Sequence, residues 1–420
     1  MSNPLARVYS IDDLARLARR RLPRAVFDFY AGGTEDELTL DRNRVAFKET
    51  AFAPRVLRDV GTINTACTLV GGVASMPLAI APMGAVGFGR RGGDIAMAKA
   101  AAMAGIPFTL STTATTSIEA VAREAGGRLW FQIYALKQNT VALSLIDRAR
   151  EAGYEVLVVT ADVPVGGKRE RDLRNDFGMP FRFSSRNVLD FASRPMWALD
   201  MLIKGLPTME NLAGLAPSDT GAVALAASVG REFDPGFDWH QLRVFRRRWP
   251  GKLLLKGIMR ADDAVCAIEC GCDGVIVSNH GGRQLDGTVS TLTALPRIAS
   301  AVGTRGEVLL DGGIRRGSDI VKALALGAAG VLVGRPALYG VCAAGQPGVK
   351  RALEILEDEL VRTLKLCGIP RLRDVTADVL WQSVEQHSTS KVAPRLLSQS
   401  VEYERRQTMA QVGETSSFKT

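Results

Sequence analysis

The run Gly274-Val-Ile-Val-Ser-Asn279 is apolar over its middle residues and then ends in polar ones. Most runs of this kind in the chain are continuously apolar and do not alternate, which is typical of parallel strands that are buried on both faces. The other seven are Pro77–Pro82, Ile106–Ser111, Leu129–Tyr134, Val156–Asp162, Lys252–Gly257, Glu307–Gly313 and Gly330–Pro336. The chain therefore carries eight candidate strands.

Helical patterns fill most of the gaps between these runs. Two of them have start signals, Ser117 two residues before Glu119 and Ser318 directly before Asp319. Eight units of a strand followed by a helix predict a closed (β/α)8 TIM barrel of the α/β class, and their similar length favours closure over an open doubly wound sheet. The clearest predicted helices are 94–104, 117–125, 140–152, 261–269 and 318–326.

We expect one barrel domain over residues 1–385, followed by a flexible polar tail over 386–420. An N-terminal helical arm precedes the barrel, with Ser10 as the cap of a helix over 11–22. The spacing breaks once, because about ninety residues (163–251) separate the fourth and fifth strands. So long a connection in a compact barrel is usually functional.

Within this insertion, the segment at about 177–215 is rich in aromatic and apolar residues. Trp197, Met201, Leu202 and Ile203 stand between the basic residues Arg194 and Lys204. Such a segment is expected to be either an interfacial membrane contact or a helical lid packed on its own barrel. The sequence leaves both alternatives open.

The bulk composition fits a soluble globular protein, with 46% apolar and 23% charged residues among 420 and a formal charge of +9. The basic runs at 19–21 and 246–248 lack interleaved aromatic residues, which disfavours nucleic acid as a partner and leaves an anionic membrane surface or an acidic substrate. Six cysteines make neither a disulfide framework nor a zinc spacing. No leader pattern or membrane-spanning run is seen. We therefore expect a cytoplasmic protein, with attachment to the inner face of the cytoplasmic membrane left open.

Polar residues and glycines follow the ends of the predicted strands. In barrels of this class the active site forms at the carboxyl ends of the strands. A rim with a purely structural role would consist mainly of Gly, Asn and Ser turns, so this rim predicts a functional site. From the first strand to the eighth, its residues are Pro82, Met83, Gly84, Ser111, Gln132, Tyr134, Thr160, Asp162, Lys256, Ser278, His280, Arg283, Asp311, Gly312, Gly313, Arg315, Gly334 and Arg335.

Three groups on this rim indicate its chemistry. His280 stands at a strand end three positions before Arg283, and a base beside a carboxylate clamp is what proton abstraction from a 2-hydroxy acid requires. Asp162, on another strand, could stabilise the resulting imidazolium. Lys256 could stabilise negative charge on a reduced flavin ring, or it could form a rim salt bridge. The glycines and Arg335 after the last two strands predict a phosphorylated ligand.

The motif Gly87-Phe-Gly-Arg-Arg-Gly92 matches the dinucleotide pattern G-x-G-x-x-G. That fold also needs an acidic residue at the end of the next strand to hold the ribose. Here the next strand ends in Leu110-Ser-Thr-Thr113, without an acid. A nicotinamide cofactor is therefore not expected.

From about Ser10 to about Ala377 the chain resembles the FMN-dependent 2-hydroxy-acid dehydrogenases and oxidases, which include glycolate oxidase, L-lactate dehydrogenase and (S)-mandelate dehydrogenase. The most specific motif is Ser278-Asn-His-Gly-Gly-Arg-Gln-Leu-Asp286, supported by Asp311-Gly-Gly-Ile-Arg-Arg-Gly317 and Lys322-Ala-Leu-Ala-Leu-Gly-Ala328. The motif Gly167-Lys-Arg-Glu-Arg-Asp172 and the long insertion look most like the membrane-associated bacterial dehydrogenases.

The resemblance implies FMN as cofactor and a role for each rim residue. His280 would be the base with Asp162 as its partner, Arg283 and Arg169 would hold the substrate carboxylate, and Tyr134 would contact the hydroxyl. Lys256 would lie beside the flavin pyrimidine. The ring would contact Ser111, Gln132, Thr160, Ser278 and the backbone of Pro82, Met83 and Gly84, and the ribityl phosphate would contact Asp311, Gly312, Gly313, Arg315, Gly334 and Arg335.

The chain departs from the family pattern at two positions. Phe29 stands where the family has a tyrosine that helps to bind the carboxylate, so one hydroxyl donor is missing unless Tyr30 takes its place, and Met83 replaces a common threonine. Both changes predict a substrate that is bulkier or more apolar than glycolate, such as lactate or mandelate. Gly84, where oxygen-reactive members often carry alanine, favours electron transfer to a quinone.

The alternatives are an oxidase that makes peroxide, a catalytically degenerate flavoprotein, and a flavin barrel that isomerises a phosphorylated substrate. The isomerase would not need the pairing of His280 with Arg283. By analogy with the family we expect a homo-oligomer, a tetramer.

Overall fold

The computed structural model describes residues 4–177, 185–215 and 232–381 of the chain. The chain divides into two compact units, residues 1–380 and residues 381–420. Nearly all of the second unit, including the predicted flexible tail at 386–420, lies outside the described residues. The fold below is that of the first unit.

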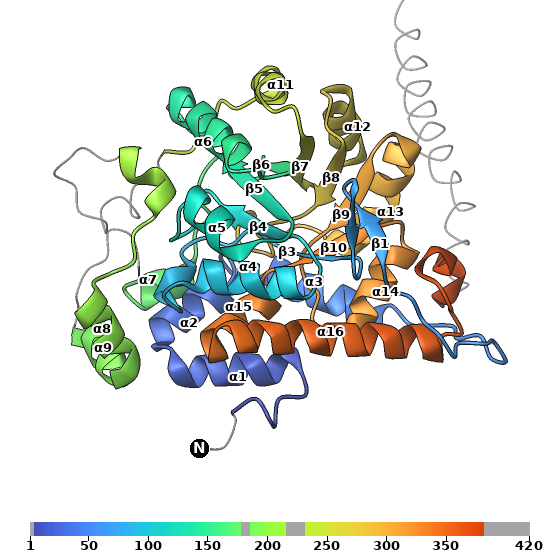
Figure 1. The fold of residues 1–420 in the computed structure, drawn as a ribbon, viewed down its shortest axis with the longest axis horizontal. Coiled ribbons are helices and arrows are strands. Elements are labelled where there is room, and N and C mark those ends of the chain that lie inside the picture. Colours follow the sequence, from blue (N-terminus) through green and yellow to red (C-terminus); the bar gives the residue numbers. More distant parts are fainter. Residues whose placement is uncertain (1–3, 178–184, 216–231, 382–420) are drawn as a thin grey trace, which may run out of the picture. The chain divides into compact units, whose positions relative to one another are not determined.

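Eight parallel strands close into a barrel, as predicted (Figure 1). Closure is made by the last and first barrel strands, where Val331 of β10 pairs with Leu78 of β3. The strands are short and almost wholly buried, in keeping with the continuously apolar runs. They are β3 (Leu78–Ile80), β4 (Phe108–Ser111), β5 (Leu129–Tyr134), β6 (Val156–Thr160), β7 (Lys252–Ile258), β8 (Gly274–Val277), β9 (Glu307–Leu310) and β10 (Gly330–Val333).

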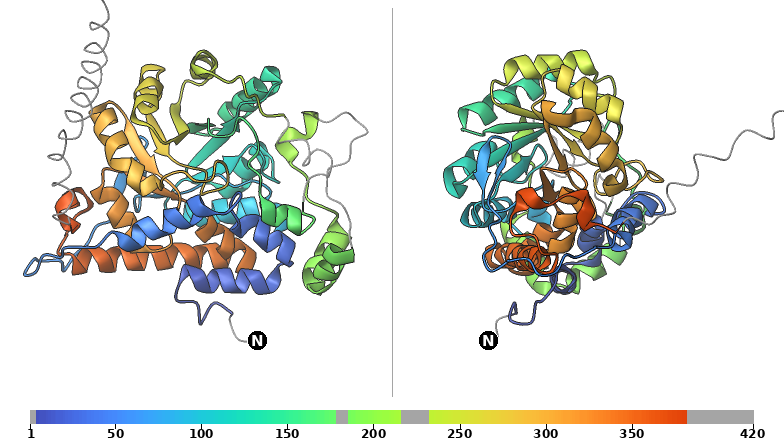
Figure 2. Two further views of the ribbon diagram at one scale, coloured as in Figure 1. Left: turned by 180° about the vertical axis from the view of Figure 1, so that it is seen from behind. Right: turned by 90° about the vertical axis from the view of Figure 1, so that its right-hand side faces the viewer.

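Helices surround this barrel, as the right-hand view of Figure 2 shows. Ser117 caps α5 by accepting a hydrogen bond from the Ala120 N–H at 3.2 Å, which confirms that start signal. The start predicted at Ser318 was wrong, because α14 begins at Gly317 after the cap residue Arg316. The helices are α4 (Gly93–Met103), α5 (Ile118–Ala125), α6 (Asn139–Glu151), α11 (Trp239–Arg248), α12 (Ala261–Glu269), α13 (Thr291–Val302), α14 (Gly317–Ala325), α15 (Arg335–Ala344) and α16 (Gln346–Leu366).

The cause of the shifted start is the side chain of Asp319. Its carboxylate accepts the backbone N–H groups of Arg315 and Arg316 at 2.8 and 3.0 Å. Asp319 thereby becomes the third residue of a helix whose N-cap is Arg316. Ser318 is then an ordinary residue of the first turn and not the cap.

The N-terminal arm consists of α1 (Ile11–Arg21), α2 (Arg24–Ala31) and α3 (Leu38–Glu49). Ser10 caps α1 as predicted, accepting the Asp13 N–H at 3.2 Å, and α1 packs on α15. Helix α2 carries Phe29 and Tyr30 to the carboxyl ends of the barrel strands, where both line a cavity. The arm therefore contributes to the site as well as to packing. The single-turn elements are η1 (Val86–Phe88), η4 (Gly303–Arg305), η5 (Leu372–Asp374) and η6 (Ala377–Val379).

In its described part, the connection between β6 and β7 forms α7 (Glu170–Arg174), α8 (Ser185–Ala192), α9 (Pro195–Lys204), η2 (Glu210–Leu215) and, directly before β7, the helix α11. One side of α9 is anchored, because Trp197 donates from Nε1 to the Phe88 carbonyl at 2.7 Å. The other side is apolar and open: Met196, Leu202 and Ile203 are 79%, 82% and 70% exposed. Within the described residues, no helix has both the length and the apolar character needed to cross a bilayer.

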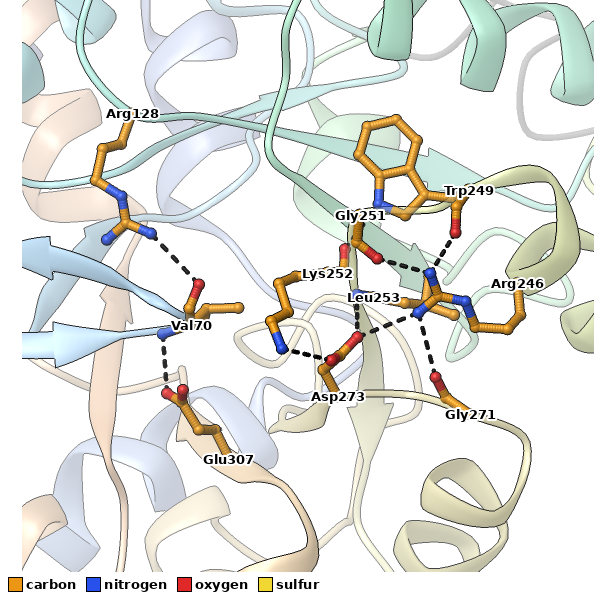
Figure 3. Close-up of polar contacts among 10 residues, drawn as sticks. All are labelled: Val70, Arg128, Arg246, Trp249, Gly251, Lys252, Leu253, Gly271, Asp273 and Glu307. Carbon is orange, nitrogen blue, oxygen red and sulfur yellow. Dashed lines mark hydrogen bonds and ion pairs between the residues drawn. The ribbon is translucent and has the colours of Figure 1, made fainter.

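The amino ends of the strands are closed by a hairpin of β1 (Cys67–Leu69) and β2 (Gly72–Ala74), which the sequence reading did not predict. Ion pairs and hydrogen bonds surround it (Figure 3). Glu307 accepts the Val70 N–H at 3.0 Å, and Asp273 binds both Lys252 and Arg246. This end of the barrel is occupied by structural contacts, so the open end is the one where the strands finish.

Candidate active site

A cavity of about 350 Å³ opens at the carboxyl ends of the strands. Most of the rim residues singled out from the sequence line it. Four do not: Ser111, Gln132, Asp162 and Ser278 lie behind the wall and hydrogen-bond to one another or to lining residues. The predicted residues on the wall are Phe29, Pro82, Met83, Gly84, Tyr134, Thr160, Arg169, Lys256, His280, Arg283, Asp311, Gly312, Gly313, Arg315, Gly334 and Arg335.

His280 is held by a carboxylate from another strand. Its Nδ1 lies 3.0 Å from Oδ1 of Asp162, and its backbone N–H donates to Ser278 Oγ at 3.1 Å. Burial acts to raise the pKa of Asp162, but the imidazole and Lys256 outweigh it and hold that pKa below its ordinary value. With Nδ1 engaged, Nε2 is the nitrogen with which His280 can accept a proton from a ligand.

The backbone around this pair is specialised. His280 has φ of 57°, in the left-handed region that a non-glycine residue rarely adopts. A Cβ at Gly257 would lie 2.6 Å from the Cβ of Asp162, so only glycine fits beside this carboxylate. Backbone strain of this kind tends to occur at functional sites.

Lys256 forms a buried ion pair. Its Nζ lies 3.0 Å from Oδ2 of Asp311 and donates to Ser278 Oγ at 2.7 Å. Burial alone would lower the pKa of Lys256, but Asp311 and Asp162 outweigh burial and raise it. The amine is therefore a stable cation on the cavity wall. The salt bridge that was one of the two alternatives for Lys256 exists, and it leaves the ammonium in reach of a ligand.

The far end of the cavity suits an anion. The N-terminus of α15 and the glycines after β9 line the cavity, and backbone N–H groups at such positions can bind an anion. Gly313 has φ of +92° and a Cβ there would lie 2.2 Å from the Asn43 carbonyl, so glycine is required. Burial lowers the pKa of Arg315 to about 10 and also lowers that of Arg335. Both arginines donate to backbone carbonyls, and within the described residues neither forms an ion pair with a carboxylate.

Arg335 also ties the arm to the barrel. Its three nitrogens donate to the carbonyls of Tyr30, Gly281 and Gly32 at 2.8–3.1 Å. The guanidinium has five N–H groups, so a phosphate could use the remaining two. The sequence reading had assigned this arginine to the phosphate alone.

Phe29, Arg169 and Arg283, which stand where the substrate carboxylate was predicted to bind, also line the cavity. Tyr30 does not replace the missing hydroxyl, because its own hydroxyl donates to the Ala85 carbonyl and accepts the Gly89 N–H, both at 2.8 Å. Burial, together with Arg169 and Arg335, lowers the pKa of Arg283 to about 9. An anionic ligand would relieve this excess of positive charge.

The lining residues that were not predicted from the sequence include Phe233, Met209 and Thr113. Phe233 packs on Tyr134, with ring centroids 4.7 Å apart. Thr113 lies two residues after Ser111, just past the predicted strand end. Phe233 and Met209 belong to the insertion, where no periodic pattern marks their position.

The residues fit FMN. Two buried polar atoms, Gln132 Nε2 and Thr160 Oγ1, have no hydrogen-bond partner within the described part of the chain. Buried polar groups are normally satisfied, so these atoms call for a ligand with polar edges. A flat polar ring near them and Lys256, joined to a phosphate near Arg315 and the glycines, matches this donor set.

The comparisons with known proteins agree with this geometry. The family model described as FMN-dependent dehydrogenase matches residues 18–382. (S)-Mandelate dehydrogenase of Pseudomonas putida is 43% identical over 374 residues, covering 89% of this chain and 94% of that protein. L-Lactate dehydrogenase of Caulobacter sp. (strain K31) is 40% identical, covering 89% and 98%. L-Lactate oxidase of Nostoc sp. is 41% identical, covering 87% and 96%.

Solved structures give the same result. A crystal structure described as the monotopic membrane protein (S)-mandelate dehydrogenase superposes with a TM-score of 0.86 at 42% identity, covering 90% of this chain and all of that one. The crystal structure of a mandelate oxidase superposes with a TM-score of 0.76 at 38% identity, covering 89% and 98%.

Proposed function

The chain belongs to the family of FMN-dependent dehydrogenases, with FMN as cofactor, and from this premise we propose that it oxidises an apolar (S)-2-hydroxy acid to the 2-oxo acid. The observation that carries the proposal is the His280–Asp162 pair at 3.0 Å on the cavity that Arg283 and Arg169 also line. A base, an orienting carboxylate and a carboxylate clamp thus converge from different loops.

In this mechanism His280 Nε2 takes up the proton that leaves the 2-hydroxy acid, and Asp162 stabilises the imidazolium that results. Arg283 and Arg169 hold the substrate carboxylate, and Tyr134 contacts the hydroxyl. FMN, when bound, would accept the two electrons together with the second hydrogen that the acid loses. Lys256 would supply positive charge beside the ring, and Thr160 on the wall with Ser111, Gln132 and Ser278 behind it would hold the ring.

We propose mandelate or lactate as the type of substrate, and not glycolate. Phe29, Phe233, Met209 and Met83 line the cavity and give it an apolar wall. The test is anaerobic mixing of the holoenzyme with (S)-mandelate, (S)-lactate and glycolate while flavin absorbance is followed. Bleaching by mandelate or lactate supports the proposal, and preferential bleaching by glycolate contradicts it.

We propose a quinone as the electron acceptor. Gly84 lies against Thr113, and a Cβ at Gly84 would lie 2.1 Å from Thr113 Oγ1, so the alanine common in oxygen-reactive relatives does not fit without rearrangement. Reoxidation of the reduced enzyme in air is expected to be slow and reoxidation by a water-soluble quinone fast. Rapid reoxidation in air with peroxide production would assign an oxidase instead.

We propose that α9 docks on the surface of the cytoplasmic membrane, in keeping with a related structure described as a monotopic membrane protein. The exposed Leu202 and Ile203 would enter the interface. Replacing both by Glu should reduce cosedimentation with anionic vesicles. Leu366→Glu is the control, because Leu366 on α16 is 70% exposed, as Ile203 is. Equal binding by both variants contradicts membrane docking through α9.

The formation of a tetramer stays a prediction, which analytical ultracentrifugation can test.

A further inference from the structure

Two guanidinium groups from distant parts of the chain lie over one aromatic ring. The Cζ of Arg283 is 5.2 Å from the centroid of the Phe29 ring, and the Cζ of Arg169 is 5.4 Å from it. Phe29 belongs to the N-terminal arm, Arg169 precedes α7 and Arg283 follows β8. The ring is thus the common contact of both members of the carboxylate clamp.

The charges of these two arginines are unevenly compensated. Arg169 donates from Nε to Oδ2 of Asp172 at 2.7 Å. Arg283 instead donates from Nη1 to the carbonyls of Phe29 and Gly32 at 2.7 and 2.9 Å, and within the described residues no carboxylate forms an ion pair with it. The negative face of an aromatic ring attracts such a cation, and the attraction grows when the pair is shielded from water.

The position of the ring is fixed by other aromatic residues. Phe29 contacts Tyr30 edge to face with centroids 5.3 Å apart, and Phe177 lies 5.5 Å away. Tyr30 is itself held by hydrogen bonds to the backbone at Ala85 and Gly89. These contacts restrict the position of the ring, so it can support the two arginine side chains.

We infer that Phe29 is a positioning residue that holds Arg169 and Arg283 against their mutual repulsion, ready to receive the substrate carboxylate. This inference rests on the proposed function. Phe29 thus keeps the π face and the backbone carbonyl that a tyrosine would also offer here, and it lacks only the hydroxyl. In this chain the carboxylate is bound by the two arginines, and the ring acts on it only through them.

The test compares Phe29→Leu, which keeps bulk and removes the π face, with Phe29→Tyr, which keeps it. Calorimetry on the holoenzymes gives Kd for phenylacetate, a non-oxidisable carboxylate, and for neutral benzyl alcohol. Phe29→Leu should raise Kd for phenylacetate about 5- to 30-fold and leave Kd for benzyl alcohol nearly unchanged. Phe29→Tyr should bind phenylacetate at least as tightly as the wild type. With (S)-mandelate, Phe29→Leu should raise KM more than it lowers kcat.

Phe88→Leu is the matched control. Phe88 packs edge to face on Phe177 in the same cluster, with centroids 6.3 Å apart, and in the described part of the chain no cation lies over its ring. The Phe88→Leu variant should leave the ratio of the Kd for phenylacetate to the Kd for benzyl alcohol unchanged. Equal weakening of both ligands by Phe29→Leu, an unchanged ratio, or a wild type that does not discriminate phenylacetate from benzyl alcohol overturns the inference. If no 2-hydroxy acid bleaches the wild-type flavin, the proposed oxidation fails separately, since the Kd comparison needs no turnover.

Discussion

Nδ1 of His280 lies 3.0 Å from Oδ1 of Asp162, although 118 positions separate the two residues in the sequence. The other carboxylate oxygen, Oδ2, is buried and has no hydrogen-bond partner within the described residues. The carboxylate therefore serves chiefly the imidazole. This fixes which ring nitrogen faces the ligand, and it stabilises the ring when it becomes charged.

Replacing His280 by Gln should slow flavin reduction by a 2-hydroxy acid about 10²- to 10⁴-fold, because the base is lost. Anaerobic stopped-flow measurement of flavin absorbance reads the rate, and the FMN content should stay unchanged. Asp162→Asn should slow the step by about tenfold or more, since an amide stabilises an imidazolium poorly. His240→Gln, at an exposed position on α11, is the control and should behave as the wild type. A wild-type rate in His280→Gln would contradict the mechanism.

Replacing Lys256 by Met should destabilise the protein by about 3–5 kcal/mol, because Asp311 would keep a buried charge without its partner. The pair is only 4% and 9% exposed at its side chains, so water cannot take over. Chemical denaturation of the holoprotein measures the loss. The double variant Lys256→Met with Asp311→Asn should recover part of it, whereas additive losses would show that the ion pair does not matter.

Gly84→Ala should impair flavin binding or flavin reduction, because the new Cβ would meet Thr113 Oγ1 at 2.1 Å. Thr113→Ala removes that hydroxyl, so it should rescue Gly84→Ala. We expect the double variant to be closer to the wild type than the single one, a coupling that a double-mutant cycle of FMN affinity and reduction rate measures. Independent effects of the two changes would disprove the steric conflict.

Stability should respond to Asp94 between about pH 4 and pH 6. Burial raises the pKa of this carboxyl to about 6, although hydrogen bonds from Thr115 and Thr116 oppose the shift. The folded state thus binds this proton more tightly than the unfolded state does. Protonation therefore stabilises the fold fully below the pKa that the carboxyl has in the unfolded chain, and this stabilisation is lost as pH rises through 6. At pH 5 it amounts to about 1 kcal/mol.

Denaturation of the wild type and of Asp94→Asn at pH 5 and pH 7.5 checks this contribution. The wild type should lose about 1 kcal/mol of stability relative to the variant over that interval. Asp36→Asn, which removes an exposed carboxylate, is the control. Its free energy of unfolding should change with pH as that of the wild type does. A constant difference between the wild type and Asp94→Asn at both pH values would contradict the prediction.

The barrel and much of the rim could be predicted because both follow from local patterns. A continuously apolar run such as Gly274–Asn279 predicts a buried parallel strand, and closure then brings every strand end to one side. That step alone places His280 near Asp162 and Lys256. The family resemblance added the roles, which geometry by itself does not assign.

The remaining features depend on packing between distant segments, which leaves no periodic trace. Phe233 reaches the cavity by pairing with Leu136, and Tyr30 is committed to the backbone at Ala85. The support of two arginines by Phe29 needs three segments brought together by the fold. The start of α14 was misplaced because Asp319 accepts the backbone N–H of Arg316, which makes Arg316 the N-cap and Asp319 the third residue of the helix.

The polar contacts of Asp273 and Glu307 lie at the amino ends of the strands (Figure 3). His280 follows the carboxyl end of β8, so the length of the strands lies between these contacts and the active site. Mutations that strengthen these polar contacts can therefore accumulate during engineering or evolution without changing which 2-hydroxy acid the enzyme prefers. The two ends of the barrel can thus change independently, one in its structural contacts and the other in its substrate preference.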